Sequence, residues 1–280
     1  RLGAAYTGMY THQHGSEWRF IIDDSSPTII IVANTGVLDR LSANLSDKAE
    51  DWPSGGVILL GEEKANELPP EGVEVQNWSG FVSAGRAAPA LEKSRPDHNS
   101  LASLIYTSGT TGNPKGVMLS NWNLLSNIVA VQSVFEIYVG DRNAAFLPWA
   151  HSFGSTFDLH YMLRSGVHIN LISDLKRIAD ECQVIKPHCM LAVPRVWNKF
   201  HDRVSAQFQT SGVKRFMSGQ ANLYSAKRIR KSGTDCDAVP AKGFNDKLFD
   251  KLVWKKVRAR FGGNLRFALS GAAALSPDIA

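Results

Sequence analysis

The stretch YTSGTTGNPKGV, residues 106–117, gathers groups that could bind phosphate. From Thr107 to Gly116 it contains no large apolar side chain. Its glycines let a ligand approach backbone N–H groups, its hydroxyls donate hydrogen bonds, and its one lysine adds a mobile positive charge. The residues concerned are Thr107, Ser108, Gly109, Thr110, Thr111, Gly112, Lys115 and Gly116. So many donors within one short loop suit a concentrated anion, and a polyphosphate carries such a charge.

Two widely used phosphate-binding patterns do not fit this stretch. The pattern G-x-x-x-x-G-K-[ST] fails because Lys115 follows Pro114 and precedes Gly116, and the dinucleotide pattern fails because the loop lacks G-x-G. A plain surface turn would explain the glycines and the proline, but not four hydroxyl groups beside a lysine. We therefore interpret the stretch as a phosphate-binding loop of another kind.

The flanks of the loop predict a strand before it and a helix after it. LASLIY (101–106) is a short apolar run of the kind that is buried in a sheet, and SNWNLLSNIVAVQSVF (120–135) has helical spacing. We expect Ser120 to cap this helix, whose N-terminal dipole would favour the anion if the geometry brings the two close together. A polar loop joining a strand to a helix is the local structure that follows.

Strand-like runs recur along the chain and alternate with amphipathic helical stretches. The runs are PTIIIVA, GVILLG, SLIYT, AAFLPWA, VHINLI, CMLAVP and LRFALSG. Two apolar stripes at helical spacing are expected to be core: Trp197, Phe200, Val204 and Phe208 in one, and Phe249, Val253, Val257 and Phe261 in the other. The alternation predicts an α/β fold of layered, mostly parallel sheets with helices packed on their faces.

Composition narrows the class of protein. Of the 280 residues, 44% are hydrophobic, which is enough to build a substantial core. No apolar run approaches the roughly 18 residues of a membrane span. The three cysteines have no CxxC spacing, so neither a disulfide framework nor a zinc site is expected, and a reducing compartment is the default.

The net charge of +5 is mild, but basic residues crowd the stretch from Lys214 to Arg260. Such a stretch suits either solvated helix faces or contact with an anionic membrane. Nucleic acid is not an expected partner, because no recognised binding module accompanies the charge. Residues from about 211 to 245 have few apolar pairs and many turn formers, which favours a loop-rich insertion there.

Four stretches resemble the adenylate-forming superfamily of AMP-binding enzymes, and they occur in that family's order. YTSGTTGNPKGV is similar to its phosphate-loop signature, and FLPWAHSFG (146–154) is similar to its second motif. IKPHCMLAVPRVWNKF (185–200) resembles a stretch typical of the long-chain fatty acyl-CoA synthetase branch, and LRFALSGAAALSPDIA (265–280) resembles the stretch that lines the nucleotide and acyl pocket. Over residues 1–100 the likeness is only general.

The resemblance implies an AMP-forming ligase. Such an enzyme joins a long-chain fatty acid to the α-phosphate of ATP, releases pyrophosphate and passes the acyl group to CoA, with Mg²⁺ as the metal ion. Two like charges 4 Å apart repel by about 4 kcal/mol at an effective dielectric near 20, so donors and cations must surround the reacting anions. The resemblance assigns the β- and γ-phosphates to Thr107, Ser108, Gly109, Thr110, Thr111, Gly112 and Lys115, with Lys115 also catalytic.

His151 and three small residues complete the site that the resemblance implies. His151 is placed between the acyl carboxylate and the α-phosphate, where it would bind substrate and donate a hydrogen bond to the reacting oxygens. The small residues assigned to the substrate pocket are Gly271, Ala272 and Ala273. Trp149 and Phe153 fit a core as well as an acyl tunnel, so they stay outside the predicted site. No residue of the chain is assigned to a metal.

The sequence also departs from the family pattern. The family commonly has His-Arg where Asn121 and Trp122 stand, and Gly and Pro where Ala272 and Ala274 stand. The family's ribose-binding aspartate and the small mobile domain with its catalytic lysine have no counterpart up to residue 280. Residues 1–280 are therefore expected to be part of the large N-terminal domain, without the small C-terminal domain, and to be inactive alone.

Two other functions stay open at this point. An acyl-adenylate-forming ligase could serve a carrier protein or another acceptor instead of CoA, and a non-catalytic nucleotide-binding scaffold could keep the loop without the chemistry. The expected location is the cytoplasm. The basic stretch leaves peripheral contact with a membrane as an alternative.

Overall fold

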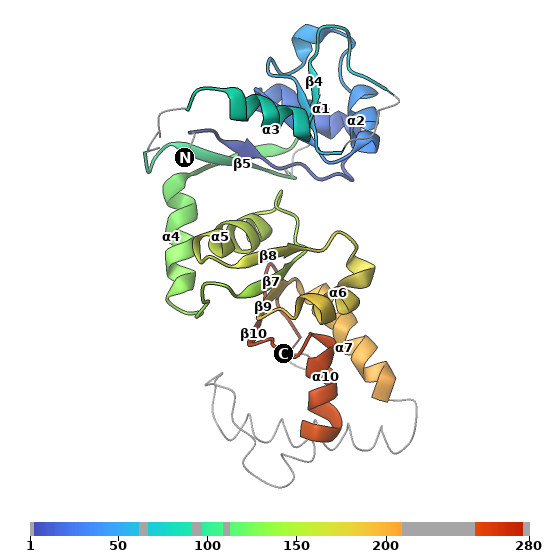
Figure 1. The fold of residues 1–280 in the computed structure, drawn as a ribbon, viewed down its shortest axis with the longest axis vertical. Helices are drawn as coiled ribbons and strands as arrows, with labels where there is room; N and C mark the ends of the chain where they lie inside the picture. Colours follow the sequence, from blue (N-terminus) through green and yellow to red (C-terminus); the bar gives the residue numbers. More distant parts are fainter. Residues whose placement is uncertain (1–2, 62–66, 91–96, 109–112, 209–249, 277–280) are drawn as a thin grey trace. The chain divides into compact units, whose positions relative to one another are not determined.

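The computed structural model describes residues 3–61, 67–90, 97–108, 113–208 and 250–276. The chain divides into two compact units (Figure 1). The first comprises residues 1–129 with 150–152, and the second comprises residues 130–149 with 153–280. The expected insertion at about 211–245, most of the basic stretch, and the loop residues Gly109, Thr110, Thr111 and Gly112 lie outside the described residues.

The first unit contains two three-stranded sheets, ordered β2-β3-β4 and β1-β5-β6. All neighbouring strands are parallel except β5 and β6. Its elements are β1 (Tyr6–Thr7), α1 (Gly15–Ser25), β2 (Ile30–Val32), α2 (Thr35–Ser42), the 3₁₀ helix η1 (Ala49–Asp51), β3 (Val57–Leu59), β4 (Val75–Asn77), α3 (Trp78–Ala87), β5 (Leu101–Thr107), β6 (Lys115–Ser120) and α4 (Asn121–Gln132). The last of these continues into the second unit.

The core of the first unit lies between β2, β3 and the helices α1 and α2. Along β2 the exposure alternates, with Ile30 and Val32 buried and Ile31 58% exposed, because successive strand residues point to opposite faces. The helices add Trp18, Ile22, Leu38 and Leu41 to this cluster. Asn34 caps α2 by accepting a hydrogen bond from the backbone N–H of Val37, which fixes where that helix begins.

The second unit is built on a parallel four-stranded sheet ordered β10-β9-β7-β8. Its elements are β7 (Arg142–Ala145), the π-helix η2 (Gly154–Tyr161), α5 (Met162–Arg164), β8 (His168–Leu171), the 3₁₀ helix η3 (Leu175–Arg177), α6 (Ile178–Ile185), β9 (Cys189–Ala192), α7 (Pro194–Phe208), the π-helix η4 (Asp250–Trp254), α10 (Lys255–Arg260) and β10 (Phe267–Ser270). The predicted α/β class with mostly parallel sheets is confirmed.

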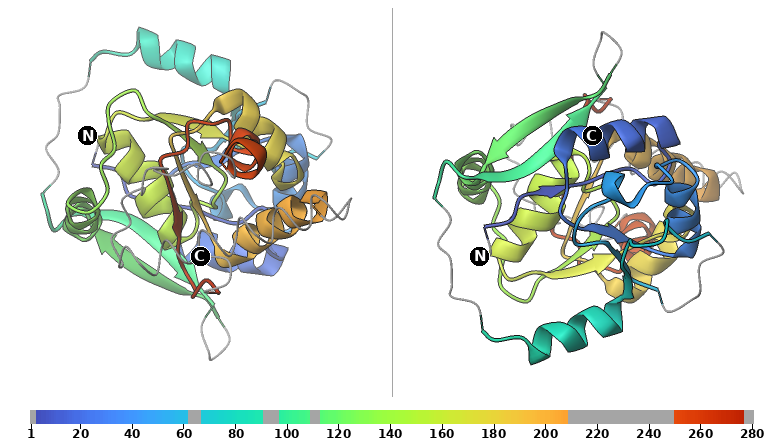
Figure 2. Two further views of the ribbon diagram at one scale, coloured as in Figure 1. Left: turned by 90° about the horizontal axis from the view of Figure 1, so that it is seen from below. Right: turned by 90° about the horizontal axis from the view of Figure 1, so that it is seen from above.

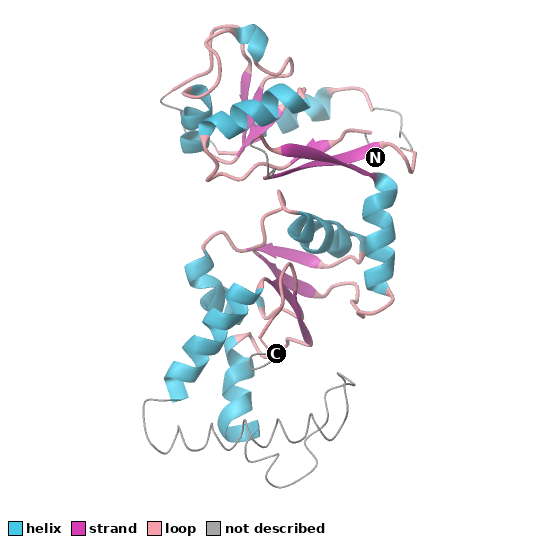
Figure 3. Ribbon diagram, turned by 180° about the vertical axis from the view of Figure 1, so that it is seen from behind, coloured by secondary structure: helices cyan, strands magenta, loops and turns pink. Residues whose placement is uncertain are grey.

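Helices cover the two faces of this sheet differently. α6, α7 and α10 lie on one side and η2 with α5 on the other (Figures 1, 2 and 3). The side chain of Ala144 joins the α6–α7 cluster, which contains Cys182, Met190 and Phe200. The preceding residue, Asn143, instead bonds to η2, as strand alternation requires. The predicted core stripe on residues 197–208 is confirmed at Trp197 and Phe200, which pack in this cluster.

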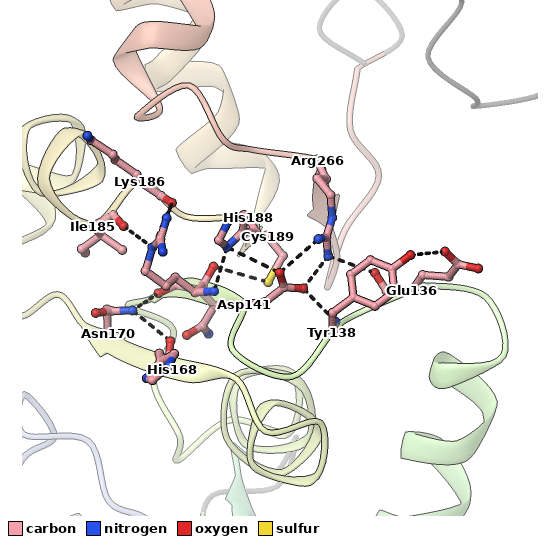
Figure 4. A network of polar contacts seen from close by, with 12 residues as sticks. Glu136, Tyr138, Asp141, His168, Asn170, Ile185, Lys186, His188, Cys189 and Arg266 are labelled. Atoms are coloured by element: carbon pink, nitrogen blue, oxygen red, sulfur yellow. Dashed lines mark hydrogen bonds and ion pairs between the residues drawn. The ribbon is translucent and has the colours of Figure 1, made fainter.

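A polar network closes the amino-terminal edge of the sheet (Figure 4). The guanidinium of Arg266, just before β10, donates two hydrogen bonds to the buried carboxylate of Asp141, just before β7. Burial raises the pKa of Asp141, but the hydrogen bonds from Arg266 and from the Tyr138 backbone outweigh it and leave the pKa lowered. Arg142 completes the network by bonding the carbonyl of Ile185 at 2.7 Å. This network stabilises the amino-terminal edge. In open α/β sheets, ligands bind at the opposite, carboxyl-terminal edge.

Candidate functional site

The described ends of the phosphate loop lie side by side. β5 and β6 are antiparallel, and their last cross-strand pair is Thr107 with Lys115. Directly opposed residues in such a pair have Cβ atoms about 5 Å apart and point to the same face. The ladder thus brings a hydroxyl and an ammonium group together at the point where the loop leaves the sheet.

These groups are open to solvent. Thr107, Ser108 and Lys115 are all exposed, and so is Asn113 beside them. Their polar atoms are therefore accessible to a ligand. The described residues contain no group of three or more His, Cys, Asp or Glu side chains that could hold a metal ion.

The predicted helix on residues 120–135 is confirmed as α4, but a strand that was not predicted stands between it and the loop. Lys115–Ser120 form strand β6, and helix α4 begins only at Asn121. Ser120 pairs with Leu101, at the far end of the ladder from Thr107, so about 17 Å of strand separates the helix N-terminus from the loop. The condition for a dipole contribution, a helix N-terminus close to the loop, is therefore not met. The predicted cap is confirmed, because the Ser120 hydroxyl accepts a hydrogen bond from the backbone N–H of Asn123 at 3.2 Å.

His151 lies in the turn between β7 and η2, six residues after the end of β7, and its side chain is exposed. The residue before it, Ala150, packs against Gly8, where an added Cβ would lie 2.8 Å from the Ala150 Cα. β1 runs parallel to β5, so Gly8 continues β1 toward the end of β5 that carries Thr107. Ala150, the residue before His151, therefore lies near the end of the β1-β5-β6 sheet from which the phosphate loop leaves.

In the second unit, the carboxyl end of β10 meets the start of η2. Gly271 follows β10, and its amide donates to the carbonyl of Ala192 at the end of β9. A Cβ built on Gly271 would lie 2.4 Å from the Phe153 ring carbon Cζ. Position 271 therefore needs a glycine, because the ring of Phe153 fills the space that a side chain would take. Sequence reasoning left Phe153 outside the site. The ring also packs against Phe157, with centroids 5.2 Å apart.

Ala272 adopts an unusual backbone conformation. Its φ is 67°, in the left-handed region that favours glycine. The family commonly has Gly at this position. A glycine at 272 would adopt this backbone conformation without strain. Ala272 and Ala273 are both exposed.

The other departures from the family pattern have local partners. The Asn121 amide donates to the carbonyl of Asp97 at 3.0 Å, and Trp122 packs against His98 with ring centroids 5.5 Å apart. Both contacts tie the start of α4 to the segment before β5. They stabilise the end of β5 and β6 that lies away from the phosphate loop.

A buried carboxyl group lies beside the segment that follows β7. Asp158, on η2, is fully buried, and the Asn143 amide donates to its Oδ1 at 3.3 Å. Burial raises the pKa of Asp158 to about 7, although hydrogen bonds from Leu147, Asn143 and Phe146 act in the opposite direction. Sequence reasoning missed this residue, since one Asp within an amphipathic stretch carries no signal of its own.

Comparison with known proteins agrees with this fold. The family model for AMP-binding enzymes matches residues 1–280. The adenylation domain of a carboxylate reductase from Mycobacterium chelonae matches all of the chain and 41% of that structure, with a TM-score of 0.71 and 22% identity. An anthranilate CoA ligase in complex with anthranoyl-AMP matches 71% of the chain and 37% of that structure, with a TM-score of 0.56 and 19% identity. At these identities the two structures support the fold alone.

Sequence relatives are closer. The peroxisomal long chain acyl-CoA synthetase 7 of Arabidopsis thaliana is 30% identical over 80% of this chain. Long-chain-fatty-acid–CoA ligase 1 of Cavia porcellus is 30% identical over 81% of it. The chain spans 31% of the length of the first and 32% of the second, about a third in each case.

The fold and the phosphate-loop signature together define an adenylate-forming α/β domain. The chain belongs to the family of AMP-binding enzymes, which the family model matches over its full 280 residues. The similar curated proteins named above are long-chain acyl-CoA synthetases, as the resemblance predicted.

Proposed function

We propose that the protein activates a long-chain fatty acid with ATP and transfers the acyl group to CoA. The observation that carries this proposal is the pairing of exposed Thr107 and Lys115 at the mouth of a loop with the family's phosphate signature. Support for the acid class comes from the long-chain acyl-CoA synthetases that the chain resembles at about 30% identity. Residues 1–280 would contribute the phosphate loop and part of the acyl pocket.

The proposed first step joins two anions. A carboxylate oxygen of the acid bonds to the α-phosphorus of ATP, and the bond from that phosphorus to the bridging oxygen breaks, releasing pyrophosphate. Thr107, Ser108 and Lys115, together with Gly109–Gly112, would bind the β- and γ-phosphates and stabilise the charge of the departing group. Mg²⁺ bound to the triphosphate would neutralise part of this charge. No residue of the chain is proposed as its ligand.

The proposed pocket residues act by position. His151 would donate a hydrogen bond to the reacting oxygens, and its exposure in the turn after β7 leaves its ring accessible. Ala272 and Ala273 would leave room for the nucleotide or the acyl chain, and Gly271 would let the Phe153 ring form a wall of the same pocket.

Exchange of pyrophosphate into ATP by the full-length protein tests the proposal. Exchange that depends on a long-chain fatty acid, followed by formation of a CoA thioester, is the expected result. Exchange without thioester formation would favour an acyl-adenylate ligase that serves a carrier protein or another acceptor. Absence of exchange with every carboxylic acid tried would contradict the enzyme and favour a nucleotide-binding scaffold.

Peripheral contact with an anionic membrane is a further part of the proposal. Lys251, Lys255 and Lys256, on η4 and α10, are exposed, whereas Arg258 is paired with Asp250 at 2.7 Å. Within the described residues, no helix is long and apolar enough to cross a membrane. Replacing Lys255 and Lys256 by Glu should release the protein from vesicles that contain phosphatidylserine. Unchanged sedimentation with these vesicles would return the three lysines to ordinary solvated surface.

A further inference from the structure

Tyr106 connects the phosphate loop to a helix far away in the sequence. It is the residue before Thr107 at the end of β5, and it is only 8% exposed. Its hydroxyl donates a hydrogen bond of 2.6 Å to the carboxylate of Asp24, near the end of α1. A short bond from a hydroxyl to a charged acceptor is among the stronger hydrogen bonds in proteins.

The ring of Tyr106 also lies across the neighbouring strand. Its cross-strand partner is Gly116, and a Cβ added there would lie 3.0 Å from Cζ and 3.2 Å from Cε1 and the hydroxyl oxygen. Contacts this close are tighter than a side chain normally makes, so Gly116 leaves the space that the ring occupies. The same tyrosine therefore contacts β6 one residue away from Lys115 and bonds to α1.

Strand β6 has little else to hold it. It is the edge strand of its sheet, and none of its residues is buried. Val117 and Met118 are 43% and 70% exposed. With so little packing, the position of Lys115 depends on the hydrogen-bonded ladder and on the ring that lies over Gly116.

The Tyr106 hydroxyl stays protonated, so it can keep donating its hydrogen bond to Asp24. Burial is the largest cause that raises the pKa of Tyr106, to about 12, followed by the hydrogen bond to Asp24 and its negative charge, while Ser25 acts in the opposite direction. The hydroxyl therefore keeps its proton at every pH at which the protein would work.

We propose that Tyr106, bonded to Asp24 and packed on Gly116, is a positioning residue that holds Thr107 and Lys115 ready for the nucleotide phosphates. The proposal rests on the proposed function, since it concerns the same phosphate loop. Without the Asp24 contact the ring would be free to leave Gly116, and the closing pair of the ladder would fray. Binding of ATP would then have to include the cost of ordering the pair again.

Kinetics of the full-length protein test this role with a matched control. Tyr106→Phe removes the hydroxyl and keeps the ring, and Asp24→Asn keeps an acceptor without the charge. Tyr138→Phe is the control, because Tyr138 also donates to a carboxylate at 2.6 Å, that of Glu136, but lies in the second unit. We expect Tyr106→Phe to raise the KM for MgATP in pyrophosphate exchange about tenfold, with a smaller rise for Asp24→Asn and none for Tyr138→Phe. The KM for the fatty acid should not change.

The outcomes distinguish failure of the positioning role of Tyr106 from failure of the proposed ligase function. A purely structural tyrosine would lower the amount of active enzyme, so a fall in kcat with an unchanged KM for MgATP would overturn the positioning role. Hydrogen exchange of the β6 amides without nucleotide gives an independent measure. We expect faster exchange in Tyr106→Phe at the β6 amides that donate to β5, and equal rates at these amides would contradict the proposal. Failure of the unsubstituted protein to exchange pyrophosphate would contradict the proposed function and leave the amide measurement to decide whether the tyrosine orders β6.

Discussion

The ring of Phe153 lies against the α-carbon of Gly271, although 117 residues separate the two along the chain. The Cβ of an alanine at position 271 would approach three ring carbons to 2.4, 2.5 and 3.0 Å. Both residues belong to the second unit, at the carboxyl-terminal edge of its parallel sheet. This contact joins the start of η2 to the predicted pocket residues after β10.

Gly271→Ala should therefore destabilise the second unit unless the ring moves. Overpacking of this kind costs about 1–3 kcal/mol in the free energy of unfolding. Phe153→Leu in the same protein removes the ring and should recover most of that loss, giving a clear coupling energy in a double-mutant cycle measured by denaturant unfolding. Additive effects of the two substitutions would show that the ring and the glycine are independent.

Lys115→Ala should impair nucleotide chemistry and spare the fold. The side chain is exposed at the start of β6, so its removal takes away a positive charge without opening a cavity. Loss of one group that stabilises developing charge typically lowers a rate on the order of a hundredfold. The measurement is pyrophosphate exchange by the full-length protein, with the exposed Lys48→Ala as control. An unchanged exchange rate in Lys115→Ala would remove the role assigned to this lysine.

His151→Ala should affect the carboxylic acid more than the nucleotide. The residue is exposed in the turn after β7, and its proposed hydrogen bond goes to the reacting oxygens. We expect exchange dependent on the fatty acid to fall about tenfold or more, while the affinity for MgATP measured by calorimetry stays within about twofold. Equal losses in both measurements would indicate that the histidine maintains the structure of the turn.

Sequence patterns predicted strands where the runs are apolar. β9 is buried at all four of its residues, and both CMLAVP and LRFALSG were recognisable as strands from their apolar runs. β6 was missed because an edge strand does not need a buried run. Val117 and Met118 point to solvent, and the polar loop before them resembles a helix N-terminus in sequence. The missed strand matters for function, since it places the helix N-terminus away from the phosphate loop.

The site could be predicted only where one continuous stretch carries it. The loop signature indicated Thr107 and Lys115 from the sequence, and the ladder confirms only that they lie side by side, not what they bind. Contacts such as Tyr106 with Asp24 join segments 82 residues apart, and no local pattern reports them. Likewise the fit of Phe153 on Gly271 depends on how β10 lies beside β9, which becomes visible only in three dimensions.

Ala272→Gly should stabilise the protein. Ala272 has a φ of 67°, and an L-residue with a Cβ is destabilised by about 1–2 kcal/mol in this left-handed region. Glycine removes that strain. It also gives the unfolded chain more conformational entropy, which lowers the stability of the folded state by about 0.4–1 kcal/mol. The difference is a net gain of about 0.5–1 kcal/mol, measurable as a higher denaturant midpoint. The neighbouring Ala273→Gly serves as control and should destabilise, because Ala273 does not have a positive φ. A loss of stability in Ala272→Gly would show that the turn relaxes in solution.

Asp158 should make stability depend on pH. Its pKa is raised from 3.8 to about 7 in the folded protein, mainly by burial, so the folded state holds a proton that the unfolded chain releases. The folded protein therefore binds more protons than the unfolded chain between about pH 4 and pH 7, and stability falls as the pH rises through this range. Since one pKa unit corresponds to about 1.4 kcal/mol, the fall amounts to a few kcal/mol at most.

The geometry around Asp158 explains which form is preferred. Among the described residues, Asp158 Oδ2 and Asn143 Oδ1 are both buried without a hydrogen-bond partner. A neutral carboxylic acid can carry its proton on Oδ2 as an O–H donor, whereas a carboxylate leaves Oδ2 as a buried acceptor without a donor. Asp158→Asn should therefore flatten the pH dependence and leave the protein more stable than the unsubstituted chain at pH 8, by about 1–3 kcal/mol. Urea unfolding at pH 5 and pH 8 measures this, with the exposed Asp180→Asn as control. If the unsubstituted protein were as stable at pH 8 as at pH 5, the carboxyl would have to be ionised at no cost, and a donor from water or from elsewhere in the full-length protein would have to reach Oδ2.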